Sequence, residues 1–504
     1  MVKKALMLGN EAIARGLVEN GCVLATAYPG TPASEILGAV AAFKTEAGVD
    51  MHVQWAVNEK VALEIAYAGS MSGLRTAVSM KQVGLNVASD PLMSAAYMGT
   101  RGGFIIVSAD DPGPHSSQTE QDSRLMAMMA KIPVLDPRSP IQAKELIAVA
   151  YEVSETYRIP VMLRPTTRVC HARQDVETKA VRPCNPVVEF KKDPARWAAT
   201  PKFRFILHQE LEGKLAQIAA EPRTAPLLLN PETQAFKAVV TSGVAAAHAF
   251  EILQAAQLGD DLALFQVLQP YPLHQAFISE LLANYETVLV IEETMGVIEM
   301  QLADRTRVKG KLTNDVPRVG ELLPETIEGL MYGFAGRQAE TRAVPAVPGR
   351  RPTLCAGCPH RASFFAIKKA APKAIYTSDI GCYTLGLNLG AVDTVLCMGA
   401  AISPAAGFYH AHKIEDRPPK IIATIGDSTF FHAGVPALID AVVQKVGFVL
   451  VILDNRTTAM TGNQPTPATG VGVSGENLQA IDMEALVKGC GVTSVRTGDP
   501  YDLK

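Results

Sequence analysis

Short apolar runs alternate with amphipathic stretches through the first 185 residues of the chain. Apolar and β-branched runs predict buried strands, and apolar positions spaced three and four apart between them predict helices. Strands that alternate with helices indicate a parallel sheet covered on both faces, so residues 1–185 are expected to form a doubly wound α/β domain. The expected strands are residues 22–27, 51–57, 75–80, 103–109 and 160–163.

Two helices of this first domain begin with polar residues. Thr31 followed by Pro32 is expected to open one helix, with the Thr31 hydroxyl as its cap and the proline in the first position. A second helix is expected to begin near Glu59, where a carboxylate also complements the helix dipole. The residues expected to point inward are Ile36, Leu37, Val40 and Phe43 in the first helix and Val61, Ile65 and Ala68 in the second.

The regular pattern weakens over residues 186–235, where prolines and charges interrupt it, so we expect a linker with one helix at 205–218. Residues 236–335 form a second expected α/β domain, in which the turn Thr241-Ser242-Gly243 fits an ordinary strand-to-helix turn better than an anion site. Residues 336–351 are rich in proline and alanine and are expected to be a second linker. The expected strands of the middle domain are 238–241, 263–267 and 288–292.

The third expected domain, residues 352–504, contains a strand-helix-strand unit with polar residues at both strand ends. An apolar run at 420–425 ends in Gly426-Asp427-Ser428, and a second at 447–453 ends in Asp454-Asn455. Both runs are expected to be buried strands. The helix between them tolerates Pro436 in its first turn. Its expected apolar face is Val435, Leu438, Ile439, Val442 and Val443.

Asp427 and Asn455 are therefore expected at the same carboxyl edge of a parallel sheet, where α/β proteins bind ligands. A hard divalent cation such as Mg²⁺ prefers oxygen donors, and this edge offers a carboxylate, an amide oxygen and the backbone carbonyl of Thr457 just beyond. The pattern predicts a metal-held diphosphate, although the triplet Gly426-Asp427-Ser428 alone also fits an ordinary turn.

Composition excludes several classes of protein. The chain has 504 residues, of which 48% are hydrophobic and 19% charged, an ordinary globular composition. A net charge of −3 and no Lys/Arg-rich run argue against nucleic acid as a partner. No 18-residue uncharged span and no signal-like N-terminus occur, so no membrane segment is expected and the protein is expected to be cytoplasmic.

Eight cysteines are scattered along the chain without the spacing of a disulfide framework. Cys355 and Cys358 form a C-x2-C pair that would suit zinc or an iron-sulfur cluster, but no second close pair follows. The residues alone leave a metal site and a plain loop open at this position.

The triplet Gly-Asp-Ser and the pair Asp-Asn, separated by about 25 residues, resemble the thiamine diphosphate (ThDP) signature. Ser428 stands where that signature usually has glycine, a small change beside a diphosphate. With the segments below, the chain resembles the large subunits of 2-oxoacid:ferredoxin oxidoreductases of the indolepyruvate type over nearly its whole length. These segments are YPGTPASE (28–35), the stretch 58–93, SSQTEQDSR (116–124), CAGCPHR (355–361), DIGCYTLG (379–386) and DNRTTAMTGNQ (454–464).

The resemblance implies three ThDP-enzyme-type domains: a pyrimidine-binding domain (1–185), a transketolase C-terminal-like domain (236–335) and a diphosphate-binding domain (352–504). It implies that Glu59 contacts the aminopyrimidine and promotes loss of the C2 proton, with Glu64 as the weaker alternative. It places Thr31 at the reacting carbonyl or the substrate carboxylate. His115, Gln118 and Glu120 are further substrate candidates because they lie in a polar loop after the 103–109 strand, although polar loops are mostly solvated. The implied cofactor-binding residues are Thr31, Glu59, Cys358, His360, Gly381, Cys382, Gly426, Asp427, Ser428, Asn455 and Thr457, with Asp427, Asn455 and Thr457 holding Mg²⁺.

The same resemblance implies oxidative decarboxylation of aryl 2-oxo acids such as indolepyruvate to acyl-CoA and CO₂, with electrons passed to ferredoxin. The implied partners are a small subunit, ferredoxin and CoA, in a homodimer of heterodimers. Family members carry 4Fe-4S clusters on C-x2-C-x2-C-x3-C-P runs, and this sequence has no such run. We therefore expect a truncated or split chain whose clusters lie elsewhere in the complex.

Two other functions remain open from the residues. A non-oxidative ThDP-dependent decarboxylase or carboligase shares this domain order and needs no clusters, although the segments at 355–361 and 454–464 argue against it. A ThDP-binding scaffold without turnover is the second alternative. Aldehyde release without CoA would favour the first, and activity with the partner subunit would exclude the second.

Overall fold

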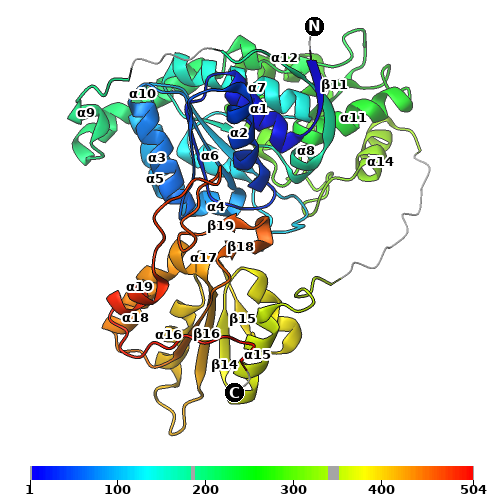
Figure 1. Cartoon of the computed structure of the whole chain (residues 1–504). Helices are drawn as coiled ribbons and strands as arrows, with labels where there is room; N and C mark the ends of the chain where they lie inside the picture. The colour runs from blue at the N-terminus through cyan, green and yellow to red at the C-terminus, as the bar shows by residue number, and fades with distance from the viewer. Residues whose placement is uncertain (1–2, 183–187, 339–350, 503–504) are drawn as a thin grey trace. The chain divides into compact units, whose positions relative to one another are not determined.

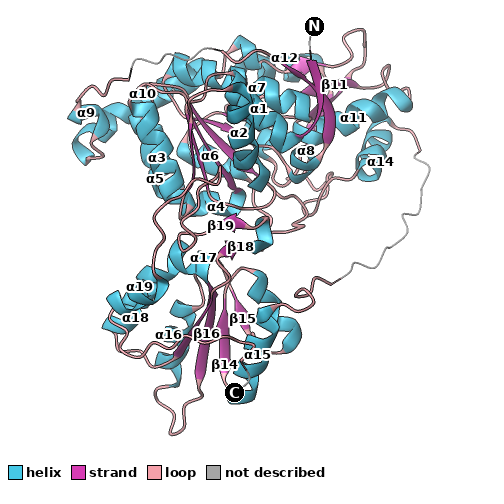
Figure 2. Cartoon of the chain, viewed as in Figure 1, coloured by secondary structure: helices cyan, strands magenta, loops and turns pink. Residues whose placement is uncertain are grey.

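The computed structural model describes residues 3–182, 188–338 and 351–502, which form two compact units, Met1–Ala343 and Val344–Lys504 (Figure 1). The expected 336–351 linker lies mostly outside the described residues. The α/β class is confirmed, because the described residues form three mainly parallel sheets with helices against them, besides the two short antiparallel pairs β1–β8 and β18–β19 (Figure 2).

The first sheet has six parallel strands in the order β3-β2-β4-β5-β7-β6. All five strands expected in this region are present, and β6 and the antiparallel pair β1–β8 were not predicted. The strands are β1 (Lys3–Leu8), β2 (Leu24–Ala27), β3 (His52–Trp55), β4 (Thr76–Lys81), β5 (Phe104–Ala109), β6 (Val134–Leu135), β7 (Val161–Leu163) and β8 (Arg173–Thr178).

Helices cover both faces of this sheet. Contacts join α1 to α2 and α7 beside one face, and α3 to α5 on the other, where α3 and α5 run side by side (Figure 1). The helices are α1 (Gly9–Glu19), α2 (Ser34–Ala47), α3 (Glu59–Met71), α4 (Gln82–Val87), α5 (Ser89–Met98), α6 (Ser123–Ala130), α7 (Pro140–Tyr157) and α8 (Thr167–His171).

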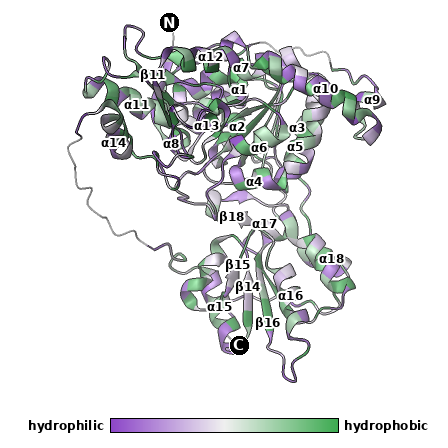
Figure 3. Ribbon diagram, turned by 180° about the vertical axis from the view of Figure 1, so that it is seen from behind, coloured by the Kyte–Doolittle hydropathy of each residue, from purple (hydrophilic) through white to green (hydrophobic). Residues whose placement is uncertain are grey.

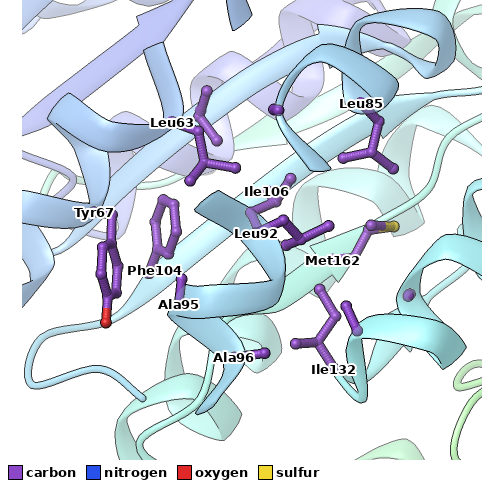
Figure 4. Packing of buried hydrophobic residues seen from close by; sticks show 14 of the residues in the cluster. Leu63, Tyr67, Leu85, Leu92, Ala95, Ala96, Phe104, Ile106, Ile132 and Met162 are labelled. Atoms are coloured by element: carbon purple, nitrogen blue, oxygen red, sulfur yellow. The ribbon is translucent and has the colours of Figure 1, made fainter. Parts of the chain in front are cut away.

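Figure 4 shows the core between α3, α5 and the sheet, where Tyr67 lies beside Phe104 with ring centroids 5.8 Å apart. The inward face expected for α3 was only partly right: Val61 is half-buried and packs against the core, but Ile65 is only half-buried and Ala68 is exposed. Small side chains on the buried face let the helix approach the sheet, and Thr26 Oγ1 donates to the Ala62 carbonyl at 2.7 Å. The buried residues of α3 are Glu59, Ala62, Leu63, Ala66, Tyr67 and Ser70.

The segment expected as the 186–235 linker contains α9 (Pro194–Trp197), α10 (Pro201–Ile218) and β9 (Leu227–Leu228). Helix α10 begins four residues before the expected 205–218 helix, with a proline in its first turn. Leu211 and Ile218 are buried in the α3–α5 core, and β9 pairs with β11 of the middle sheet. This segment therefore packs on both neighbouring sheets.

The middle sheet has the order β13-β12-β10-β11-β9, and its three expected strands are present. A buried ion-pair network joins it to the first sheet: Arg124 of α6 contacts Asp122 at 2.6 Å and Glu292 at 2.9 Å, and Arg164 contacts Asp110 at 2.7 Å. The elements are β10 (Lys237–Thr241), α11 (Gly243–Ala255), β11 (Ala263–Gln266), α12 (Gln275–Asn284), β12 (Thr287–Ile291), α13 (Val297–Leu302), β13 (Val308–Lys309) and α14 (Pro324–Ala335).

The second unit is built on a parallel sheet of order β15-β14-β16-β17, whose strands are among its most hydrophobic parts (Figure 3). A short hairpin, β18–β19, follows. The elements are α15 (Pro359–Ala370), β14 (Ile375–Ser378), a 3₁₀ segment (Cys382–Leu389), β15 (Thr394–Val395), α16 (Ile402–His412), β16 (Ile421–Gly426), α17 (Asp427–Thr429), α18 (Val435–Val443), β17 (Val449–Leu453), β18 (Thr457–Thr458), β19 (Gln464–Pro465) and α19 (Met483–Gly489).

The strand-helix-strand unit around Asp427 has the expected order, but its last strand and its helix are more exposed than predicted. On α18, Ile439 is 45% and Val443 67% exposed, and on β17 Val449 is 58% exposed. Among the described strands β17 is an edge strand, paired only with β16, so it is covered on one side. The expected burial of these residues was wrong for that reason.

Candidate active site

Asp427 lies where the sequence pattern placed it, directly after the fully buried strand β16. It is only 2% exposed, and its Oδ2 accepts a hydrogen bond from Thr466 Oγ1 at 3.1 Å. Burial, followed by the negative charge of Asp454, raises the pKa of Asp427 to about 6. A carboxylate held in this way is prepared for a positive partner.

The β18–β19 hairpin brings the residues after β17 back to Asp427. Thr457 N–H donates to Asn455 Oδ1 at 3.1 Å, and Thr458 Oγ1 donates to Ser428 Oγ at 2.9 Å. The hairpin also carries Thr466 to the Asp427 carboxylate. The structure thus gathers Asp427, Ser428, Asn455 and Thr457 at one sheet edge, and adds Thr466, which the sequence reading did not select.

Tyr383 explains two of the expected cofactor-site glycines. A Cβ on Gly381 would lie 2.3 Å, and one on Gly426 2.4 Å, from the Tyr383 ring. The buried Tyr383 hydroxyl donates to the Ile380 carbonyl at 2.9 Å, and its oxygen also lies 2.9 Å from Thr429 Oγ1. Any side chain at either glycine would displace this ring, so the two loops meet closely around it.

His360 packs against the same tyrosine, and Cys358 and Cys382 pack against the hydrophobic cluster that contains it. Cys358 caps α15, and the buried His360 ring meets the Tyr383 ring edge-on with centroids 6.3 Å apart. Burial lowers the pKa of His360, which favours its neutral form. Burial, with Cys358 and Cys355 nearby, raises the pKa of the Cys382 thiol. Both pKa shifts favour the neutral forms, of the His360 ring and of the Cys382 thiol.

Within the described residues, the C-x2-C pair is not part of a group of three or more side chains that could hold a metal ion. Seven of the eight cysteines lie there, and all seven are free thiols. Over residues 3–182, 188–338 and 351–502 no three His, Cys, Asp or Glu side chains are grouped to hold a metal ion.

Asp379, at the end of β14, is a site candidate that the sequence reading missed. Its side chain is fully buried, Oδ2 accepts from the Gly399 N–H at 2.7 Å, and burial raises its pKa to about 7. The signal was available in the DIGC segment, where only Gly381 and Cys382 were selected.

In the first unit, Glu59 is the first residue of α3, as expected, and is 5% exposed. Asn58 caps the helix by accepting from the Val61 N–H at 2.9 Å. Gly84 of α4 packs against the Glu59 carboxylate so closely that a Cβ there would lie 2.4 Å from Glu59 Oε1. The position of Glu59 at the start of α3 and the close packing of α4 therefore leave its side chain little room to move.

The prediction that Thr31 caps a helix was wrong. Helix α2 begins at Ser34 with Ala33 in the cap position and no side-chain cap. The Ala33 N–H donates to the Gly30 carbonyl at 2.7 Å, which makes Thr31 and Pro32 the central residues of a turn. Thr31 therefore lies in a half-buried loop before the helix.

His115 and Gln118 lie in the loop after β5, and both are exposed. His115 Nε2 lies 3.1 Å from Oε2 of Glu321, a residue shortly before α14. Within the same loop, Ser116 Oγ donates to the Thr31 carbonyl at 3.3 Å. The structure thus links this loop to the Thr31 turn through Ser116, while the Gln118 side chain makes no hydrogen bond to another described residue.

No helix in the described ranges is long and apolar enough to cross a membrane.

Two family models match the chain. "Pyruvate flavodoxin/ferredoxin oxidoreductase, thiamine diP-bdg" covers residues 15–222, and "Thiamine pyrophosphate enzyme, C-terminal TPP binding domain" covers residues 379–504. Glu59 lies within the first match and Asp427 within the second.

Relatives match almost the whole chain. Indolepyruvate oxidoreductase subunit IorA of Methanothermobacter marburgensis is 40% identical over 99% of this chain and 83% of its own length. The subunit of that name from Thermococcus kodakarensis is 40% identical over 100% of this chain and 82% of its own length.

Among solved structures, 2-oxoglutarate:ferredoxin oxidoreductase from Magnetococcus marinus aligns with a TM-score of 0.53 at 16% identity, covering 66% of this chain and 65% of that one. This likeness shows a shared fold. The extent and identity of the sequence matches show more: the chain belongs to the family of indolepyruvate oxidoreductase IorA subunits, and its matched domains are ThDP-binding domains of an oxidoreductase subunit.

Proposed function

We propose that the chain is the ThDP-binding subunit of an enzyme that oxidises an aryl 2-oxo acid such as indolepyruvate. The bond to the carboxylate breaks and CO₂ leaves, a thioester forms with CoA, the thiol proton is released, and two electrons pass to ferredoxin. The relatives named indolepyruvate oxidoreductase subunits support this substrate class. One observation carries the proposal: each of the two domains matched by the family models has a buried carboxylate, Glu59 or Asp427, just beyond a parallel strand.

ThDP, when bound, acts as an electron sink for the carbon it joins. Glu59 would accept and return a proton at the aminopyrimidine, a task for a carboxylate held in place and shielded from water. Its 5% exposure and its contact with Gly84 suit that task. Thr31 would line the substrate side, and Cys358, His360, Gly381 and Cys382 would line the cofactor.

Mg²⁺ fits the oxygen donors at the other sheet edge. The Asp427 carboxylate, the Asn455 amide oxygen and the Thr457 carbonyl would hold it, and it would bind and neutralise the diphosphate. The Asp427 carboxylate accepts a hydrogen bond from Thr466 and has further lone pairs for a metal ion. Asn455 Oδ1 accepts from the Thr457 N–H and has a second lone pair. Gly426 and Ser428 would let the diphosphate approach the backbone.

The proposal includes partners. A small subunit would complete the enzyme, as a homodimer of heterodimers in the cytoplasm, and 4Fe-4S clusters of the complex would carry electrons to ferredoxin. His115 and Gln118 remain proposed substrate residues, because their exposed loop joins the Thr31 turn through Ser116.

The proposal is tested by purifying the chain with its small subunit without oxygen and measuring reduction of a low-potential dye. Reduction should require indolepyruvate, CoA and ThDP together. Aldehyde release without CoA or an electron acceptor would favour the non-oxidative decarboxylase instead.

The Asp427→Ala variant should lose Mg²⁺-dependent ThDP binding in calorimetry, because the buried metal-holding carboxylate is gone. Asp440→Ala, at an exposed position of α18, is the matched control and should bind as the wild type does. Unchanged ThDP affinity in Asp427→Ala would remove the metal assignment.

A further inference from the structure

Lys81 is a buried amine at the edge of the first sheet with no role in the function proposed above. It is the last residue of β4 and only 9% exposed. Its Nζ donates to the Ser116 carbonyl at 2.8 Å and lies 3.0 Å from Ser116 Oγ. An ammonium group has three N–H bonds, so one remains for another acceptor.

The charge of Lys81 is not balanced by an ion pair. No carboxylate in the described residues lies within 4.0 Å of its Nζ. Asp111 is close enough to favour the charged amine, but its oxygens already accept from Ser116 N–H, Ser117 Oγ and Thr167 Oγ1. Burial lowers the pKa of Lys81 to about 8. A buried cation of this kind costs stability unless an anion joins it.

Close contacts connect Lys81 to the proposed reaction site on both sides. A Cβ on Gly30 would lie 2.8 Å from Lys81 Cβ, and the Ser116 that holds Nζ also donates to the Thr31 carbonyl at 3.3 Å. Three residues beyond Lys81, Gly84 packs against Glu59. Ser116 itself is exposed, so a small solute reaches the loop that Nζ contacts.

We propose that Lys81 binds the carboxylate of the 2-oxo acid substrate. Its ammonium donates a charge-assisted hydrogen bond to one carboxylate oxygen, and Ser116 holds the amine in place beside the Thr31 turn. The choice of ligand rests on the proposed function, whereas the position of the amine does not.

The test uses the complete complex with Mg²⁺ and the thiazolone analogue of ThDP, whose C2 cannot add to a carbonyl. Calorimetry compares indolepyruvate with its methyl ester, which lacks the negative charge. The wild type should bind the acid about 10- to 100-fold more tightly than the ester. Lys81→Met should lose this preference while keeping its affinity for the ester, and Lys81→Arg should retain part of it.

Lys311→Met is the matched control. Lys311 is also buried, at 3% exposed, and its Nζ donates to the Pro317 carbonyl at 2.6 Å. This variant should keep the preference of the wild type for the acid.

Two outcomes overturn the inference: a wild type that binds the acid no better than the ester, or a Lys81→Met variant that keeps the preference. The wild-type comparison can overturn the inference even if Lys81→Met fails to fold. An acid preference that depends on Lys81, in a complex that reduces no dye, would contradict only the proposed oxidation. Dye reduction together with a preference that survives in Lys81→Met would contradict only the role of Lys81.

Discussion

Gly84 sets the position of Glu59, because a Cβ there would lie 2.4 Å from Glu59 Oε1 and 2.7 Å from its Cγ. Gly84→Ala should therefore displace the carboxylate. Since proton transfer by a positioned group contributes about 10²–10⁴-fold to a rate, we expect kcat in the dye assay to fall by about tenfold or more. ThDP affinity should stay close to that of the wild type.

Gly213→Ala is the control for this substitution. Gly213 lies in the interior of α10, and a Cβ there would meet no atom within 4 Å. It should leave kcat unchanged and raise stability by about 0.5–1 kcal/mol, because alanine favours the helix. Full activity in Gly84→Ala would show that the packing around Glu59 is not needed.

At the residue scale, sequence reasoning found side chains that belong to a recognisable motif and missed those whose role depends on the fold. Asp427 and Glu59 occupy the expected positions after a strand and at a helix start. Thr466 and Lys81 were missed because their partners are distant in the sequence. The β18–β19 hairpin brings Thr466 to Asp427, and the loop after β5 brings Ser116 to Lys81, 35 residues earlier in the chain. Thr31-Pro32 fitted both a helix cap and a turn, and only the Ala33 hydrogen bond decides between them.

At the element scale, α10 tests whether residues 201–218 are part of the core. Leu211 is 1% exposed and packs in the α3–α5 cluster, so Leu211→Ala should lower the free energy of unfolding by about 2–5 kcal/mol. Ile206 of the same helix is 64% exposed, and Ile206→Ala should change it by about 0.5 kcal/mol or less. Denaturant unfolding of both variants measures the difference, and equal effects would mean that α10 is a surface linker.

Strand positions were easier to predict than helix faces. Apolar runs located β4, β5 and β16. A strand buried on both faces is hydrophobic at nearly every position, so it can be found without knowing which residues face which side of the sheet. The inward face of α3 was predicted only in part, because its buried face is centred on Leu63 and Tyr67, while Val61 packs at the margin of the core. On α18 the apolar stripe was real, but the edge strand β17 leaves part of it uncovered.

At the scale of the whole molecule, the proposed function divides its tasks between the two compact units. Glu59 belongs to Met1–Ala343 and Asp427 to Val344–Lys504. Within the first unit, buried Arg124 bonds to Glu292 and the Glu293 carbonyl and so fixes the middle sheet to the first. Sequence patterns did not indicate this network, whose members are far apart in the chain. The account needs Asp427 for cofactor binding and Glu59 for cofactor activation.

The most direct test of this account is the rate at which the C2 proton of bound ThDP exchanges with deuterium, followed by NMR in the complete complex. The wild type should exchange rapidly, and Glu59→Gln should bind ThDP but exchange about 10²–10⁴-fold more slowly. Glu64→Gln, one turn along α3 at a 46% exposed side chain, should exchange as the wild type does. Wild-type exchange in Glu59→Gln, or slow exchange in Glu64→Gln alone, would contradict the assignment of Glu59 and the account built on it.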